Sequence, residues 1–133
     1  MRISGRFDVN IIRASEIAYV ETPGANRTAG IATPNHGARE VSVIRQRQQP
    51  GGGNPAHTHD REEVMLVTAG VVEVHIGGNR VVLDAGDTLV IPASTEHRLA
   101  NAGDTEAEWL LIAPAGIGFF HANGERAEPV WSR

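Results

Sequence analysis

The chain has 133 residues, carries a net charge of −4 at pH 7 and contains no cysteine. This length predicts one domain with a core of its own, and the absence of cysteine excludes disulfides and thiolate metal sites. Because the twelve basic residues are scattered, we expect no nucleic-acid partner. The sequence shows neither a membrane span of ~20 apolar residues nor a signal peptide, so we expect a cytoplasmic protein that binds a small molecule.

The glycine and proline content predicts the type of secondary structure. Fifteen glycines and seven prolines, in a chain that is 41% hydrophobic, favour short strands and tight turns over helices. The N-terminal part is loosely patterned, with an edge strand expected at 7–12, a strand or helical turn at 14–19 and a turn at 22–26. Strands are expected next at 30–33 and 41–45, before a glycine-rich loop at 49–55.

The pattern is more regular from residue 63 onwards. Short apolar or alternating runs predict strands at 63–68, 71–76, 80–83, 88–91, 97–100 and 108–113. The sequence Gly77-Gly78-Asn79 indicates a hairpin between the second and third of these strands. Strands this short, with turns at such close spacing, predict an all-β sandwich or barrel.

Histidines and one glutamate form the most informative pattern. His57 and His59 are two residues apart, so both rings lie on one face if the segment is a strand. Glu63 can share that face, whereas Glu62 would then point to the opposite face and into solvent. Imidazole nitrogens and carboxylate oxygens suit first-row transition metals, so the pattern predicts a single bound metal ion.

The same residues resemble the cupin superfamily over about residues 41–113. Its first motif, G-x5-H-x-H-x3,4-E-x6-G, is matched by Gly51, His57, His59, Glu63 and Gly70. Its second motif, G-x5-P-x-G-x2-H-x3-N, is matched by Gly86, Pro92, His97 and Asn101. Ser94 stands where the family usually has glycine, at a turn position that binds no metal.

The resemblance implies a single-domain cupin jelly-roll β-barrel, also called a double-stranded β-helix. Residues 41–113 would form the barrel core, 1–40 N-terminal strands or an arm, and 114–133 an extension packed on the barrel. The implied metal ligands are His57, His59, Glu63 and His97, and the ion would be divalent iron, manganese, nickel, copper or zinc. Small barrels of this family commonly exchange an N-terminal strand between subunits, so we expect a homodimer.

The resemblance also points to an activity. Similar cupin dioxygenases suggest a metal-dependent oxygenase that acts on a small organic molecule. Four ligands on an ion that accepts five or six would leave positions for substrate or dioxygen. Glu63 would then be both a ligand and the catalytic proton acceptor. Two alternatives stay open, namely a non-redox isomerase or lyase acting on a sugar or sugar acid and a non-catalytic cupin that binds a small ligand.

Strand alternation predicts which side chains line the pocket. If Glu63 points inward, Met65 and Val67 do too, and an inward His97 brings Leu99 and Asn101 with it. Upstream, either Arg45 and Arg47 or Gln46 and Gln48 face the metal. The arginines would clamp a carboxylate, whereas the glutamines would suit a neutral polar ligand.

The remaining aromatic residues and histidines match no motif position. Ordinary core packing is the preferred expectation for Trp109, Phe119, Phe120 and Trp131. The alternatives are that Trp109 packs against a substrate ring and that the other three cover an open barrel mouth or a subunit contact. His36, His75 and His121 match no motif either, and His75 is expected on the surface of its strand.

Overall fold

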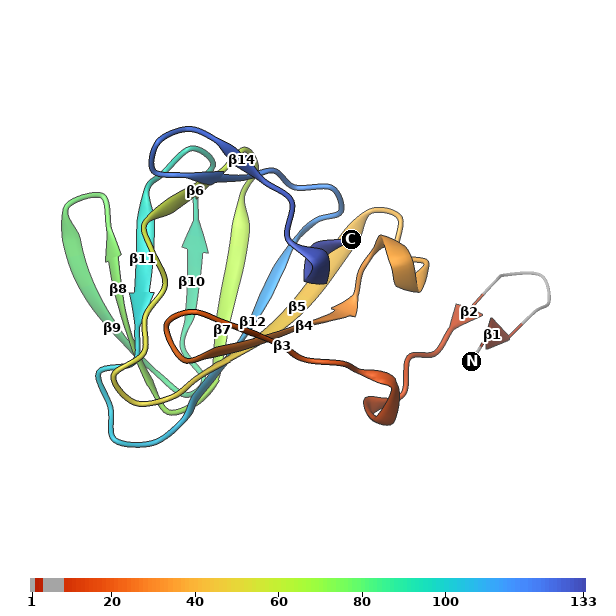
Figure 1. Cartoon of the computed structure of the whole chain (residues 1–133), viewed down its shortest axis with the longest axis horizontal. Helices are drawn as coiled ribbons and strands as arrows, with labels where there is room; N and C mark the ends of the chain where they lie inside the picture. The colour runs from red at the N-terminus through yellow and green to blue at the C-terminus, as the bar shows by residue number, and fades with distance from the viewer. Residues whose placement is uncertain (1, 4–8) are drawn as a thin grey trace.

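The chain folds into a barrel made of two facing antiparallel sheets (Figure 1). The computed structural model describes residues 2–3 and 9–133, and its elements are β-strands and short 3₁₀ turns. The all-β, single-domain jelly roll expected from the sequence is confirmed. Within the described residues, no helix is long and apolar enough to cross a membrane.

Each of the two sheets has six strands. The first, in the order β10-β7-β12-β5-β4-β3, contains β3 (Val20–Thr22), β4 (Asn26–Ala32), β5 (Val41–Gln48), β7 (Glu63–Ala69), β10 (Thr88–Ile91) and β12 (Ala107–Pro114). The second, in the order β14-β13-β6-β11-β8-β9, contains β6 (His57–His59), β8 (Val71–Ile76), β9 (Asn79–Asp84), β11 (His97–Ala100), β13 (Phe119–His121) and β14 (Arg126–Ala127). Both sheets therefore include strands from outside residues 41–113.

The N-terminal residues lie apart from the barrel. The strands β1 (Arg2–Ile3) and β2 (Val9–Asn10) pair with each other and project away from both large sheets (Figure 1). The edge strand expected at 7–12 is therefore only β2 in its described part, and Phe7 and Asp8 lie outside the described residues. Segment 14–19 contains the 3₁₀ turn η1 (Ala14–Glu16) rather than a strand.

Tight turns set the strand boundaries. Gly77 and Gly78 join β8 to β9 with φ angles of 56° and 79°. Two successive positive φ values are what a type I′ hairpin turn needs, and glycine adopts them without strain. The strand expected at 30–33 begins earlier, at Asn26, because a turn over 23–25 folds it back on β3.

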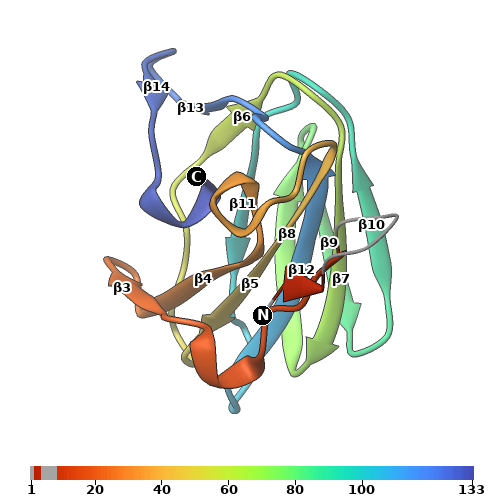
Figure 2. The same cartoon turned by 90° about the vertical axis from the view of Figure 1, so that its right-hand side faces the viewer.

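The apolar core fills one part of the barrel and leaves another part hollow. Its buried members are Met65, Val67, Val72, Val74, Leu83, Ile91, Leu99, Ala107 and Trp109. Glu63, Met65 and Val67 are all buried on β7, as their alternation predicted, but only Glu63 lines the cavity, and Met65, Val67 and Trp109 are in the core. The hollow part lies beside β6, where β13, β14 and the 3₁₀ turn η3 (Val130–Ser132) cross the end of the barrel (Figure 2). The remaining 3₁₀ turn is η2 (Pro34–His36).

Candidate metal centre

Three buried histidines converge inside the barrel. His57 and His59 lie on β6, and His97 opens β11, where it pairs directly with His57 across the two strands. One ligand nitrogen from each ring lies within 4.8 Å of the other two. The strand pairing thus brings together residues about forty positions apart, as the motif spacing predicted.

All three rings are held in the same tautomer by the backbone. His57 Nδ1 lies 2.9 Å from Pro55 O, His59 Nδ1 3.2 Å from Gly118 O, and His97 Nδ1 2.8 Å from Thr95 O. Because a carbonyl oxygen can only accept a hydrogen bond, each Nδ1 must carry the proton. Each Nε2 therefore keeps its lone pair, which is the arrangement of a metal-binding imidazole with its second nitrogen anchored.

Burial keeps these imidazoles neutral. Burial, with a smaller contribution from the nearby His97, lowers the pKa of His57 to about 3 and that of His59 to about 4. Burial also lowers the pKa of His97. All three lone pairs are consequently available at neutral pH without the release of a proton.

Glu63 lies beside the histidine cluster. Its side chain is buried, and its Oε2 atom is 3.6 Å from His59 Nε2. Burial raises the pKa of Glu63 to about 7, because an ionised carboxylate here has lost most of its water. The carboxyl group lies outside the three-histidine group, so its role as fourth ligand stays a prediction. Glu62 is exposed, as the alternation predicted.

The donor set fits a divalent cation. Three neutral imidazoles and an adjacent buried carboxyl group form a polar cluster inside the barrel. A cation would bind the three free lone pairs and would favour the ionised form of Glu63. Nitrogen and oxygen donors of this kind suit several first-row metals, so the donor set does not select one of them.

A cavity of about 460 Å³ opens onto the histidines. Apolar atoms make up most of its surface, and its polar side chains include Thr28, Gln46 and Asn54 beside the carboxyl groups of Glu63 and Glu128. Asn54 Nδ2 donates to Gln46 Oε1 at 3.1 Å, and Gln46 Nε2 donates to Thr28 Oγ1 at 3.0 Å. The cavity therefore presents a connected row of neutral hydrogen-bonding groups.

The structure decides which face of β5 looks inward. Gln46 and Gln48 are buried, whereas Arg47 pairs with Glu108 on the outer face at 2.8 Å. Arg45 donates to Tyr19 Oη at 3.1 Å. The arginine clamp that the sequence left open is therefore absent from the cavity, and the glutamine alternative holds.

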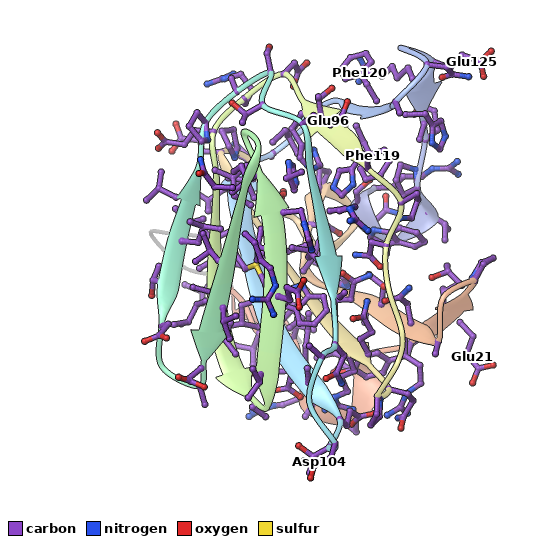
Figure 3. The ribbon with its side chains drawn as sticks, turned by 90° about the vertical axis from the view of Figure 1, so that its left-hand side faces the viewer. Glu21, Glu96, Asp104, Phe119, Phe120 and Glu125 are labelled. Carbon is purple, nitrogen blue, oxygen red and sulfur yellow. The ribbon has the colours of Figure 1, made fainter. Side chains whose placement is uncertain are left out.

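Aromatic residues near the C-terminus line the cavity, so the barrel-mouth alternative holds for Phe119 and Trp131. The ring of Phe119 stacks on His57, with 4.5 Å between centroids and 15° between planes. Phe119 points into the barrel while Phe120 lies outside it (Figure 3). Trp131 and His121 also line the cavity, so ordinary core packing was the wrong expectation for Phe119 and Trp131. By contrast, His75 binds Glu73 at 2.6 Å and is partly exposed.

The other motif residues shape the loops around the site. Ser94, at the usual glycine position, has a φ of 58°, and its N–H donates to His59 O at 2.7 Å. Asn101 is buried, as expected, and its side chain donates to Gln48 O and Thr105 O. Both residues donate hydrogen bonds to backbone carbonyls, and neither lines the cavity.

Known proteins have sequences similar to this chain. Germin-like protein 3-5 of Oryza sativa subsp. japonica is 39% identical over 106 residues, which cover 73% of this chain and 42% of that protein. Oxalate oxidase 1 of Hordeum vulgare is 37% identical over 102 residues, covering 70% of this chain and 45% of that protein. The chain thus spans less than half the length of these curated relatives.

A solved structure and a family model agree with the sequence relatives. Recombinant oxalate oxidase in complex with glycolate superimposes with a TM-score of 0.68 at 29% identity, over 75% of this chain and 56% of that chain. The cupin domain model matches residues 44–113, which is more than half of the chain. The histidine cluster, the jelly roll and this match together show that the chain belongs to the cupin family.

Proposed function

We propose that this protein is a metal-dependent oxygenase that acts on a small, uncharged organic molecule. The main support for this proposal is that three imidazoles with free Nε2 lone pairs line a cavity of about 460 Å³. A cavity of this size is in the range used for small-molecule ligands. The proposed ligands are His57, His59, His97 and Glu63.

The residues around the cluster have separate proposed roles. A redox-active divalent metal ion would supply Lewis-acid and electron-transfer chemistry to a substrate oxygen and to dioxygen. Glu63, 3.6 Å from His59, would accept a proton from the substrate hydroxyl group as it binds. Gln46 and Asn54 would orient the polar end of the substrate, and Phe119 would exclude water from one side.

The cavity lining supports an uncharged substrate. Among the described residues that line it, none is lysine or arginine. Ile44, Leu99, Leu111 and Trp131 offer apolar contact for a hydrocarbon body. Flavonols, diketones and catechol-like compounds combine such a body with neighbouring oxygen atoms.

A small dicarboxylate is the second candidate substrate. The observation that favours it is the 37% identity to an oxalate oxidase over 70% of this chain. Oxalate would fill only a small part of the cavity, and its second carboxylate would meet amides and apolar groups rather than a cationic side chain. We therefore place oxalate oxidation behind the uncharged substrate.

The test is oxygen consumption by protein loaded anaerobically with Fe²⁺, Mn²⁺, Ni²⁺ or Cu²⁺. We expect uptake with at least one flavonol, diketone or catechol and little uptake with oxalate. The reverse result, with release of carbon dioxide from oxalate, would favour the second candidate. Activity with Zn²⁺ in the absence of oxygen would instead support the non-redox isomerase or lyase.

Two variants control for adventitious metal. His97→Ala should abolish both metal retention and oxygen uptake, because it removes one of three clustered nitrogens. His75→Ala removes a histidine that binds Glu73 outside the cluster, and it should leave both unchanged. Tight retention of a small ligand by the loaded protein, with no turnover under any condition, would make it a binding cupin.

We also propose that the protein acts as a homodimer in the cytoplasm. The dimer is supported by a row of apolar side chains on the outer face of the first sheet. The absence of cysteine from the sequence supports the cytoplasmic location, because it suits a reducing compartment.

A further inference from the structure

The C-terminal segment touches the metal centre at two neighbouring positions. The Gly118 carbonyl accepts from His59 Nδ1 at 3.2 Å, and the ring of Phe119 stacks on His57. Gly118 immediately precedes β13 and Phe119 begins it, and this strand pairs with β6 through Phe119 and His59. The orientation of two proposed ligands therefore depends on where this strand is held.

Asp60 holds that strand at the point of contact. The Gly118 N–H donates to Asp60 Oδ1 at 2.6 Å, and the Asp60 N–H donates to Gly118 O at 3.3 Å. A hydrogen bond to an ionised carboxylate is stronger than one to a neutral acceptor. The carboxylate thus holds the Gly118 N–H and the Asp60 backbone N–H holds the Gly118 carbonyl, so Asp60 fixes the backbone on both sides of the Gly118 Cα atom.

The fit between these two residues is close. A Cβ atom on Gly118 would lie 2.6 Å from Asp60 Oδ2 and 2.8 Å from a ring carbon of Phe120. A side chain at residue 118 would have to displace the Asp60 carboxylate or the Phe120 ring, and glycine avoids this. Asp60 is itself exposed, and the apolar core does not depend on it.

We infer that Asp60 is a positioning residue for the metal centre, acting through the Gly118 peptide on the ring of His59. The inference rests on the proposed function for its effect on metal affinity. The hydrogen-bond chain itself belongs to the metal-free protein. Because coupling between sites is reciprocal, metal binding should in turn tighten the attachment of β13.

The first test compares metal affinity in matched aspartate variants. Asp60→Ala should weaken Zn²⁺ and Mn²⁺ binding by about 10-fold, the lower end for loss of an outer partner of a ligand. Asp60→Asn keeps an acceptor oxygen without the charge and should fall between wild type and Asp60→Ala. Asp87→Ala removes a carboxylate that accepts from the Asp84 N–H at 2.8 Å in a distant turn, and it should change nothing.

The second test uses the metal-free protein and needs no activity. Two-bond ¹H–¹⁵N spectra report the tautomer of each imidazole, and wild type should show Nδ1–H for all three. In Asp60→Ala, His59 should become a mixture of tautomers while His97, anchored on Thr95, stays unchanged. Hydrogen exchange of the Gly118 amide should also speed up.

The outcomes separate this inference from the proposed function. Failure of wild type to bind any metal would remove the proposed function, but the His59 tautomer would still decide the role of Asp60. The inference is overturned if Asp60→Ala frees the Gly118 amide while the His59 tautomer stays as in wild type. Equal losses of affinity in Asp60→Ala and Asp87→Ala would overturn it as well.

Discussion

Glu63 and the clustered histidines respond to pH in opposite directions when no metal is bound. The pKa of Glu63 rises on folding from 4.5 to about 7, so its stabilising effect is complete below pH 4.5 and is lost as pH rises to 7. The pKa values of His57 and His59 fall from 6.5 to about 3 and about 4. Their stabilising effect is complete above pH 6.5 and is lost as the pH falls towards those values.

Glu63→Gln should therefore stabilise the metal-free protein at high pH. At pH 8 we expect a gain in unfolding free energy of up to about 3 kcal/mol, because the variant no longer buries a charge. The gain should disappear below pH 4.5, where the Glu63 carboxyl is protonated in both states. Urea unfolding of wild type and Glu63→Gln at pH 4 and pH 8 measures the gain in unfolding free energy at each pH.

The neighbouring Glu62→Gln is the control for this prediction. Glu62 is exposed, so the substitution should leave stability unchanged at both pH values. With metal present, Glu63→Gln should bind the ion more weakly than wild type, because a neutral amide replaces the proposed carboxylate ligand. If Glu63→Gln gained the same unfolding free energy at pH 4 and pH 8, the gain would come from altered packing and not from the removal of a buried charge.

At the scale of the elements, the turn between β10 and β11 carries local strain. Ser94 adopts a φ of 58°, in the left-handed region that favours glycine. Its amide nevertheless donates to His59 O at 2.7 Å, which ties this turn to β6. The hydrogen bond comes from the backbone and therefore does not require the serine side chain.

Ser94→Gly should raise stability without changing the metal centre. Relief of the left-handed strain contributes about 1 kcal/mol or more, and the larger chain entropy of glycine offsets part of it. We expect a net gain of about 0.5 kcal/mol and a rise in Tm of about 2 °C. Differential scanning calorimetry of the metal-free protein measures this, with Ser94→Ala as the control that keeps the Cβ atom. A gain in the alanine variant would contradict the strain explanation.

At the scale of the whole molecule, the outer faces of the two sheets differ. On the first sheet, Val90, Val64, Ile112 and Val43 lie side by side on four adjacent strands. An antiparallel sheet with one face in water usually alternates apolar and polar residues, whereas β7 and β12 are apolar on both faces. The arm formed by β1 and β2 projects away from its own barrel (Figure 1). We propose that a second copy covers this face.

Light scattering at micromolar concentration should give twice the chain mass of 14.2 kDa. Val90→Lys should weaken the dimer by at least about 10-fold in Kd, because it sets two like charges against an apolar face. Val82→Lys on the second sheet is the matched control, since Val82 is 46% exposed and Val90 is 53% exposed. A mass of one chain for wild type, or equal dissociation in both variants, would contradict the dimer.

The sequence by itself determined the parts of this protein that depend on local spacing. The two-residue step between His57 and His59 places both rings on one face of any strand. The hairpin at Gly77-Gly78 and the inward row of Glu63, Met65 and Val67 follow from turn chemistry and alternation in the same way. The resemblance to the cupin motifs identified His97 as a third ligand, and the structure places it on the strand that pairs with β6.

Only the tertiary structure decided the features that depend on which segments meet. Alternation showed that Gln46 and Arg45 face opposite ways, but the pairing of β5 between β4 and β12 was needed to show which one faces the cavity. The sequence could not choose between core packing and the barrel mouth for Phe119, and Asp60 carried no sequence signal, because both roles arise from the pairing of β13 with β6. Local spacing fixes how side chains alternate, whereas contacts between distant segments exist only once the chain has closed into a barrel.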